Sequence, residues 1–397
     1  MKAVIFAAGK STRTYPLTLT RPKPLLPVAN KPIIVHQLEA LPDSVDEVIV
    51  VVGYMREMIE DALGNSFNGI ALRYVEQKEQ KGTGHALLQC KDYIDDDFLA
   101  FNGDDIYHKD DMKTLANFEQ GSLCTTVEDP SRFGVFIVNS DGNLEQVVEK
   151  PDTPISYLVN IGAYKFTPAV FDILETTLLS SRGEIEITSA IQSIAETAPF
   201  VIREITGHWL SIGYPWDILD ATQAFLNELK DNRQGDIHEA AFISGAVSVG
   251  RGTEIKPGVV IEGPVIIGEN CIIGPNAYIR SHSAIGNNCK VGQGSELKGT
   301  VLMNGAKVPH LSYIGDSIIG EGANLGCGTT TANFRHDGKN HKSLIKGTLV
   351  DTERRKFGAI VADDVHTGIN TSIYPGRKLW PHTSTLPGEI VKTDIEI

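Results

Sequence analysis

The sequence predicts an α/β domain of the Rossmann-like type, followed by a left-handed parallel β-helix built from hexapeptide repeats. Two observations predict this order. Strand-like and helix-like segments alternate through the first 230 or so residues, and from Val249 onward one aliphatic residue returns every six positions. A helix repeats every 3.6 residues and a strand every two, so a period of six fits a parallel β-helix, in which one aliphatic side chain per hexad fills the core. The repeating positions are Val249, Ile255, Ile261, Ile267, Ile273, Ile279, Ile285, Val291 and Leu297.

The elements of the first domain follow from hydrophobic patterning. Apolar, β-rich runs predict strands at residues 2–9, 47–53, 71–77, 98–105 and 123–127. Helical spacing predicts helices at residues 31–41, 55–63, 82–91, 188–196 and 217–229. This alternation is typical of a mostly parallel sheet with helices on both faces, and such sheets bind ligands beyond the carboxyl ends of their strands.

A chain of 397 residues is long for a single core, which favours two domains. We predict a first domain at residues 1–232, a linker at residues 233–240 and a β-helix at residues 241–397. The hexads run to about Thr300, break near residues 308–313 (VPHLSY), resume at Ile319 and break again in a polar loop at residues 333–346.

Composition narrows the possible partners and the compartment. The formal net charge of −14 argues against nucleic acid as a partner, because phosphate contacts along a nucleic acid need clustered Lys and Arg. The apolar N-terminal run is too short to span a membrane and shows no signal-peptide cleavage site, so no membrane partner is expected. The five cysteines have no CxxC spacing and are typical of reduced thiols in a cytoplasmic protein.

A loop rich in small residues follows the first predicted strand, in the segment FAAGKSTRTYPLTLTRPKPLLP at residues 6–27. Ala8 and Gly9 allow a phosphate or a base to approach the backbone, whose amides can donate to it. Arg13 and Lys23 supply cations suited to a polyphosphate. The GKST stretch is not a P-loop, because Val4 stands where that motif requires glycine.

This segment resembles the signature of the sugar-1-phosphate nucleotidylyltransferases, G-x-G-T-R-x-x-P-x-T followed by P-K-P-L-x-P. Later residues match the landmarks of that family in order and at suitable distances. The resemblance assigns the nucleotide to Ala8, Gly9, Gln77, Gly82 and Thr83, Mg²⁺ to Asp104, and the sugar phosphate to Gly134, Glu149, Lys150 and Asn160. It implies in-line attack of a sugar phosphate on the α-phosphorus of UTP or dTTP, with Arg13 and Lys23 as the catalytic cations.

Two positions depart from that family's pattern. Ser11 replaces the second glycine of the phosphate loop, and Ser211 stands where the family often has a second metal-binding aspartate. Serine is a weak, neutral ligand for Mg²⁺. Metal binding is therefore expected to depend on Asp104, the substrate phosphates and water, and a slower or altered first activity is one consequence.

The second half resembles the amino-sugar-1-phosphate acetyltransferases, and most closely the archaeal bifunctional enzymes that join both activities. This resemblance rests on three segments, residues 308–316 (VPHLSYIGD), 324–329 (NLGCGT) and 332–334 (ANF). It implies acetyl-CoA as co-substrate, a homotrimer or a multiple of it, and His310 as general base, since imidazole titrates near the working pH. The remaining substrate-binding residues implied are Arg280, Lys298, Tyr313, Asn324 and Asn333, with Lys339 or Lys342 for the sugar or CoA phosphates.

Other interpretations remain open on sequence alone. The β-helix could serve only oligomerisation or regulation behind a single nucleotidylyltransferase. Alternatively, Ser11 and Ser211 could mark a degenerate nucleotide sensor whose sole activity is acetyl transfer. The basic run Arg354, Arg355 and Lys356 could bind the CoA 3′-phosphate or could form a solvated turn. The favoured interpretation is a bifunctional enzyme acting on hexose or hexosamine 1-phosphates for nucleotide-sugar synthesis.

Overall fold

The structure is a computed structural model that describes residues 1–151, 153–180 and 182–396. Contacts between Cα atoms divide the chain into two units. The first unit comprises Met1–Lys10, Pro22–Leu25 and Ile33–Ser211, and the second comprises Ser11–Arg21, Leu26–Pro32 and Ile212–Ile397. Part of the loop that resembles the nucleotide signature therefore belongs to the second unit.

The first unit is built on a mixed sheet in the order β11-β10-β12-β7-β1-β4-β6-β5, with β9 and β13 attached to β12. Its centre is parallel, since β1 pairs in parallel with β4 and β7, and β4 pairs in parallel with β6. The strands are β1 (Lys2–Phe6), β4 (Glu47–Val52), β5 (Ser66–Phe67), β6 (Ile70–Glu76), β7 (Phe98–Asn102), β9 (Gly121–Thr126), β10 (Gly134–Val138), β11 (Leu144–Glu149), β12 (Leu158–Phe166) and β13 (Val201–Glu204). A separate pair joins β8 (Asp105–Tyr107) to β14 (Trp209–Ser211).

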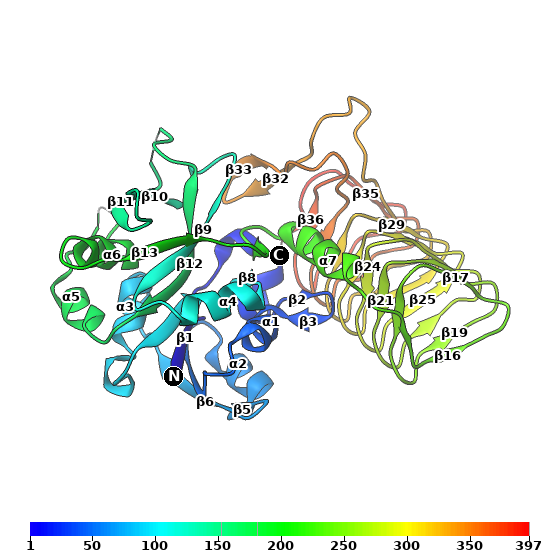
Figure 1. The fold of residues 1–397 in the computed structure, drawn as a ribbon. Helices are drawn as coiled ribbons and strands as arrows, with labels where there is room; N and C mark the ends of the chain where they lie inside the picture. Colours follow the sequence, from blue (N-terminus) through cyan, green and yellow to red (C-terminus); the bar gives the residue numbers. More distant parts are fainter. Residues whose placement is uncertain (152, 181, 397) are drawn as a thin grey trace. The chain divides into compact units, whose positions relative to one another are not determined.

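Helices cover both faces of this sheet, as predicted (Figure 1). Val4 and Ile49 face a core shared with α3, α5 and α6, whereas their neighbours Ile5 and Val50 face a core shared with α1, α2 and α4. This alternation arises because successive strand side chains point to opposite faces. The helices are α1 (Ile33–Ala40), α2 (Arg56–Leu63), α3 (Thr83–Leu88), α4 (Lys109–Ala116), α5 (Val170–Thr176) and α6 (Ile187–Ala195). The α/β prediction for this half is confirmed.

The second unit contains three parallel sheets, here called the three-sheet region (residues 232–391), whose short strands repeat side by side in Figure 1. The first sheet holds β15 (Asn232–Arg233), β18 (Val247–Val249), β21 (Val265–Ile267), β24 (Ser283–Ile285), β27 (Val301–Leu302), β30 (Ile318–Ile319), β34 (Ile360–Val361) and β36 (Lys378–Leu379). The second holds β16 (Asp236–Ile237), β19 (Glu254–Ile255), β22 (Ile272–Ile273), β25 (Lys290–Gln293) and β28 (Lys307–His310). The third holds β17 (Phe242–Ser244), β20 (Val260–Glu262), β23 (Tyr278–Ile279), β26 (Glu296–Lys298), β29 (Tyr313–Gly315), β31 (Thr330–Thr331), β35 (Ser372–Ile373) and β37 (Ile390–Val391).

The six-residue period marks buried positions of the three-sheet region. The nine aliphatic residues from Val249 to Leu297 are all buried in one core cluster of the three-sheet region. Burying each such side chain contributes roughly 1.5–3 kcal/mol, so the repeat stabilises the whole stack. Strands β15 and β16 lie in or beside the segment predicted as a linker and already pair with the following turn of the stack.

The breaks in the hexad pattern have two different structural causes. Paired residues are 18 positions apart at Val265 and Ser283, but only 17 apart at Glu296 and Tyr313, so one turn has lost a residue and the stack continues. The second break is an insertion, because Thr330 pairs with Ser372, 42 positions later. The inserted residues form an excursion with a hairpin, β32 (Lys342–Ile345) and β33 (Thr348–Asp351).

The second unit also contains a helix and two short strands outside the stack. These are α7 (Asp217–Asn227), β2 (Pro27–Val28) and β3 (Lys31–Pro32). The backbone amide of Ala29, between β2 and β3, donates to the hydroxyl of Thr222 on α7 at 3.2 Å. No helix among the described residues is long and apolar enough to cross a membrane.

Candidate active sites

A buried ion pair marks the first candidate site, at the carboxyl end of β7. Lys23 Nζ lies 2.7 Å from Asp104 Oδ2, and the lysine side chain is 4 % exposed against 39 % for the aspartate. Asp104 follows Gly103, which packs so closely that an added Cβ would lie 2.5 Å from the carbonyl oxygen of Phe6. A buried lysine needs a partner to remain charged, so this pair holds a cation beside an accessible carboxylate.

The neighbouring carboxylate, Asp105, was not singled out from the sequence. It is buried, it starts β8, and its main chain pairs with that of Ser211 on β14. Burial and the nearby negative charge of Asp104 together raise the pKa of Asp105 to about 7, although the cation of Lys23 and hydrogen bonds from Ser211 and Asn102 oppose the shift. Ser211 therefore forms a hydrogen bond with the carboxyl group of Asp105. The sequence position of Ser211 did not reveal this contact.

We expect Asp105→Asn to stabilise the metal-free protein in a pH-dependent way. An unfolded aspartate releases its proton near pH 3.9, whereas folded Asp105 retains it up to about pH 7. Stability therefore falls as pH rises between these values, and the substitution removes this loss. Urea unfolding in EDTA should show a gain on the order of 2 kcal/mol at pH 8 and a much smaller gain at pH 4.5. The exposed Asp61→Asn on α2 is the matched control, and an equal gain at both pH values would contradict the buried charge.

The predicted nucleotide-reading residues meet at the carboxyl ends of β1 and β6. Gln77 Nε2 donates to the carbonyl oxygen of Gly82 at 3.0 Å and lies 3.1 Å from Nδ1 of His85. Gly82 has φ of 97°, and an added Cβ would lie 2.6 Å from the carbonyl oxygen of Ile185, so only glycine fits there. Thr83 then begins α3.

Ala8 and Gly9 follow β1 directly, as the sequence predicted. The carbonyl oxygen of Ala8 accepts from the amide of Tyr54 at 3.1 Å and from Gln80 Nε2 at 2.8 Å. These bonds fix the backbone on which the small-residue loop begins. Gln80 is a further loop residue that sequence reasoning did not identify.

The predicted sugar-phosphate residues also lie together in the first unit. A Cβ added to Gly134 would lie 2.9 Å from Glu149 Oε2 and 3.7 Å from Cβ of Asn160. Glu149 in turn pairs with Lys150 at 3.3 Å and with Arg182 at 3.4 Å. A cavity of about 570 Å³ is lined by Glu149, Lys150 and Arg182, among others. Arg182 was missed because it lies just before the GEIEIT segment, outside any matched motif.

Arg13 belongs to the second unit. Its guanidinium lies 5.8 Å from the ring centroid of Tyr214. Ser11 adopts the left-handed backbone conformation, with φ of 50°. This conformation is the one glycine favours, so the serine found at this position is tolerated at some conformational cost.

The second candidate site is a polar cluster on the third sheet of the three-sheet region. Lys298 Nζ lies 2.9 Å from Asp316 Oδ2, which also accepts from Asn333 Nδ2 at 2.5 Å. Asn333 Nδ2 donates to the hydroxyl of Tyr313 at 3.1 Å. Gly315 makes room for these groups, because an added Cβ would lie 2.6 Å from Asn333 Nδ2. Four side chains from three turns thus share one surface.

Arg280 lies one turn below Lys298 in this sheet and pairs with Glu296 at 3.0 Å. Asp316 and Glu296 are partners that the sequence reasoning did not assign. Each neutralises one cation of the cluster, and Asp316 links Lys298 to Asn333. The last residue of the quoted VPHLSYIGD motif is Asp316, so the motif itself was the available signal.

His310 and Asn324 lie outside this hydrogen-bonded cluster. His310 ends β28, is exposed, and is separated from Tyr313 by the corner at Leu311, whose φ is 47°. Asn324 pairs with Lys307 and His366 on the second face of the stack. The structure therefore brings Lys298, Tyr313 and Asn333 into contact within one chain, and Asn324 stands apart from them.

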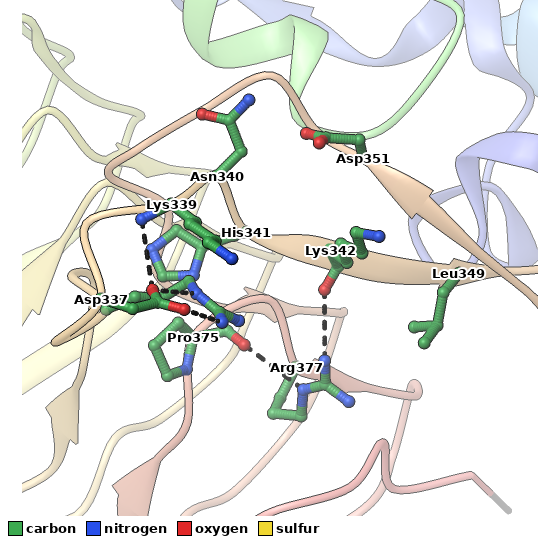
Figure 2. A pocket seen from close by; sticks show the side chains of 10 residues that line it. Asp337, Lys339, Asn340, His341, Lys342, Leu349, Asp351, Pro375 and Arg377 are labelled. Atoms are coloured by element: carbon green, nitrogen blue, oxygen red, sulfur yellow. Dashed lines mark hydrogen bonds and ion pairs between the residues drawn. The ribbon is translucent and has the colours of Figure 1, made fainter.

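The two candidate loop lysines line one cavity of about 770 Å³. Figure 2 shows Lys339, His341, Lys342 and Arg377 around it. Arg377 Nη2 donates to the carbonyl oxygen of Lys342 at 3.3 Å. Arg335 also lines the cavity. The lining therefore combines several cations with two carboxylates, Asp337 and Asp351.

His341 connects this cavity to the polar cluster. Its Nε2 lies 3.0 Å from the carbonyl oxygen of Asn333, and burial lowers the pKa of its ring. Arg354 pairs with Asp220 on α7, and Arg355 donates to the carbonyl oxygen of Gly338 at 3.1 Å. The first two residues of the basic run thus hold the insertion in place.

Comparison with known proteins identifies the family. Residues 2–228 match the family model described as nucleotidyl transferase, and residues 261–385 match the GMPPB C-terminal domain. The chain is 42 % identical over its whole length to the bifunctional protein GlmU of Methanococcus aeolicus, covering 96 % of that protein. The chain belongs to this bifunctional family.

A second full-length relative supports the same membership. The bifunctional sugar-1-phosphate nucleotidylyltransferase/acetyltransferase of Sulfurisphaera tokodaii is 37 % identical over 100 % of this chain and 98 % of its own length. A crystal structure of UDP-glucose pyrophosphorylase complexed with UDP-glucose aligns with a TM-score of 0.51 at 28 % identity, covering 57 % of this chain and 98 % of the other. Membership in this family therefore identifies the chain as a bifunctional enzyme. It does not favour a single-activity nucleotidylyltransferase or a sensor.

Proposed function

We propose that this enzyme transfers a nucleotidyl group from UTP or dTTP to a hexose or hexosamine 1-phosphate and acetylates an amino-sugar 1-phosphate with acetyl-CoA. The polar cluster formed by Lys298, Tyr313, Asp316 and Asn333 carries the second assignment, because a stack serving only assembly has no need of a lysine, a carboxylate, a phenol and an amide joined on one face. Both products would serve nucleotide-sugar synthesis.

In the first reaction, an oxygen of the sugar phosphate forms a bond to the α-phosphorus of the triphosphate, and the bond to the leaving pyrophosphate breaks. This chemistry requires alignment and charge neutralisation more than a protein base. Lys23 is suited to the α-phosphate and the attacking phosphate, because its cation is already desolvated. Arg13 is assigned to the leaving pyrophosphate. Gln77 and Gly82 are assigned to the base.

A divalent metal fits this site only together with a substrate. Among the described residues, no three carboxylate, histidine or cysteine side chains group closely enough to hold a metal by themselves. Asp104 offers an accessible carboxylate, and Mg²⁺ commonly combines one or two carboxylates with substrate phosphates and water. Asp104 would therefore hold Mg²⁺ with the triphosphate, where the ion makes the α-phosphorus more electrophilic.

In the second reaction, the amine nitrogen forms a bond to the acetyl carbon as CoA leaves as a thiol. His310 is assigned as the base that removes the amine proton, because its ring is exposed at the end of β28, just before the corner at Leu311 that leads to Tyr313. The amino-sugar phosphate is assigned to a binding site formed by Arg280, Lys298, Tyr313 and Asn333. Asn324 keeps its proposed role in substrate binding on the adjoining face.

Lys339 and Lys342 are both retained as candidates for a phosphate of the sugar or of CoA. They share one cavity with Arg335 and Arg377, which supports a polyanionic occupant. Because His341 joins this cavity to Asn333, a phosphate held there would lie in the same network as the amine-binding residues.

We further propose that the three-sheet region is a left-handed β-helix and that the enzyme forms a trimer or a multiple of it. Successive turns of six-residue faces support the first proposal. Exposed Leu311, Ile369 and Leu386 on the edge that carries His310 support the second, since a neighbouring copy could cover them. The cytoplasm is the proposed compartment, because all five cysteines are free thiols.

The test is a pair of assays on the purified full-length protein. With Mg²⁺, UTP or dTTP and a panel of hexose 1-phosphates, we expect release of pyrophosphate. With acetyl-CoA and glucosamine or galactosamine 1-phosphate, we expect release of a free thiol that depends on the sugar. Absence of thiol release with every amino-sugar phosphate would overturn the second activity, and absence of pyrophosphate release would overturn the first.

A further inference from the structure

An ion pair holds the segment Ser11–Arg21 to the three-sheet region within the second unit. Arg21 Nη2 lies 2.5 Å from Asp363 Oδ2 and 2.8 Å from Glu321 Oε2. The side chains of Arg21 and Asp363 are only 14 % and 7 % exposed. Thr20 Oγ1 donates to the same Asp363 oxygen at 2.6 Å, so one carboxylate fixes two consecutive residues of the segment.

A chain of ring contacts holds the other end of this segment. Arg13 lies over Tyr214, whose ring stacks on Trp216 with centroids 4.7 Å apart and planes at 15°. Trp216 meets Phe357 edge-on at 5.9 Å, and both residues are buried. Phe357 lies at the end of the insertion in the three-sheet region. The proposed leaving-group arginine is thus placed by rings that rest on this region.

We propose that Asp363 is a positioning residue for nucleotidylyl transfer, acting on the segment that carries Arg13 and leads into Lys23. The inference goes beyond the proposed function but rests on the catalytic roles assigned there to Arg13 and Lys23. Arg21 and Arg13 lie in the same segment of the second unit, so a fixed Arg21 limits where Arg13 can reach. A misplacement of about 1 Å at a catalytic group can lower the rate roughly 100-fold.

The charge of Asp363 is not needed by the stack itself. The turn is held by backbone bonds from Ala362 to the carbonyl oxygen of Leu379 at 3.0 Å and from Asp364 to that of Glu321 at 2.9 Å. The other oxygen of Asp363, Oδ1, accepts from the amide of Glu321 at 2.7 Å, a bond that an asparagine oxygen can also accept. Among the described residues, Oδ2 of Asp363 is bound by Arg21 and Thr20.

The test compares Asp363→Asn with the neighbouring Asp364→Asn, which makes the same change at an exposed position. We expect Asp363→Asn to lower kcat for pyrophosphate release about 10- to 100-fold, with a smaller change in KM for the triphosphate. Thiol release and the melting temperature should stay close to wild type, and Asp364→Asn should behave as wild type. Unchanged pyrophosphate release, or an equal loss of both activities together with a lower melting temperature, would overturn the proposal.

A double-mutant cycle gives an independent measurement. If Arg21 and Asp363 act as one unit, Arg21→Met combined with Asp363→Asn should lower the rate no more than either substitution alone. Multiplicative losses would overturn the proposal. Wild-type enzyme is assayed in parallel: if it releases no pyrophosphate, the proposed function fails, whereas a working wild type with an unaffected Asp363→Asn overturns only the positioning role.

Discussion

His310→Ala is expected to lower the rate of acetyl transfer about 10²- to 10⁴-fold, the range typical of a lost general base, while pyrophosphate release continues. The amine must lose its proton as it attacks the thioester, and the exposed imidazole of His310 at the end of β28 is the group assigned to accept it. Continuous thiol detection with acetyl-CoA and an amino-sugar 1-phosphate measures the effect.

The control for this experiment is His238→Ala, an exposed histidine near the first turn of the same stack. Its Nδ1 accepts from the amide of Ala240 at 3.1 Å, a bond confined to that turn. Both variants should retain the wild-type melting temperature, because His310 is exposed. If His310→Ala acetylates at the wild-type rate, the general-base assignment is wrong even though the family assignment stands.

Lys23→Met is expected to give the opposite pattern, lowering pyrophosphate release about 10²- to 10³-fold and sparing thiol release. Methionine retains most of the buried stem but removes the cation, so the change isolates charge from packing. Asp104 then loses its partner, but at 39 % exposure water can solvate it, and we expect the protein to fold. A coupled pyrophosphate assay with Mg²⁺ and a sugar 1-phosphate measures the loss.

Lys109→Ala, at the exposed start of α4, is the matched lysine control. A Lys23→Met variant that releases pyrophosphate normally would contradict the assignment of this cation to the reacting phosphates. Together with His310→Ala, it also separates the two activities, because each substitution should abolish one reaction and preserve the other.

Sequence patterning predicted a large share of the fold because its signals are local and periodic. The hexads correctly identified buried core residues of the second unit, since the aliphatic side chains that return every six residues pack into one core cluster. The alternating segments of the first half likewise identified β1, β4, β6 and β7 and their helices. What periodicity could not distinguish was a one-residue deletion from an insertion, because both interrupt the same repeat.

The candidate site residues also fall into two groups, those that a local motif marks and those that depend on distant partners. Lys23 and Asp104 were recognised from their motifs, and the structure pairs them across 81 positions of sequence. Asp105 and Arg182 were missed, since their burial or their partners depend on residues elsewhere in the chain, whereas Asp316 lay within a matched motif and was not assigned a role. Burial shifts the pKa of Asp105, and burial is not encoded in its immediate neighbours.

Residue patterns along the chain were sufficient to predict the α/β sheet of the first half, the buried six-residue repeat of the second half and the family to which the chain belongs. Other features emerge only in the folded chain: Arg21 meets Asp363, 342 positions away, and Asn333 meets Asp316 and Tyr313 on one face. The range of the forces involved explains this division. A hydrophobic repeat can be recognised from residues only a few positions apart in the sequence. An ion pair or a hydrogen bond requires two atoms within about 3 Å of each other. Residues hundreds of positions apart come that close only when the chain folds.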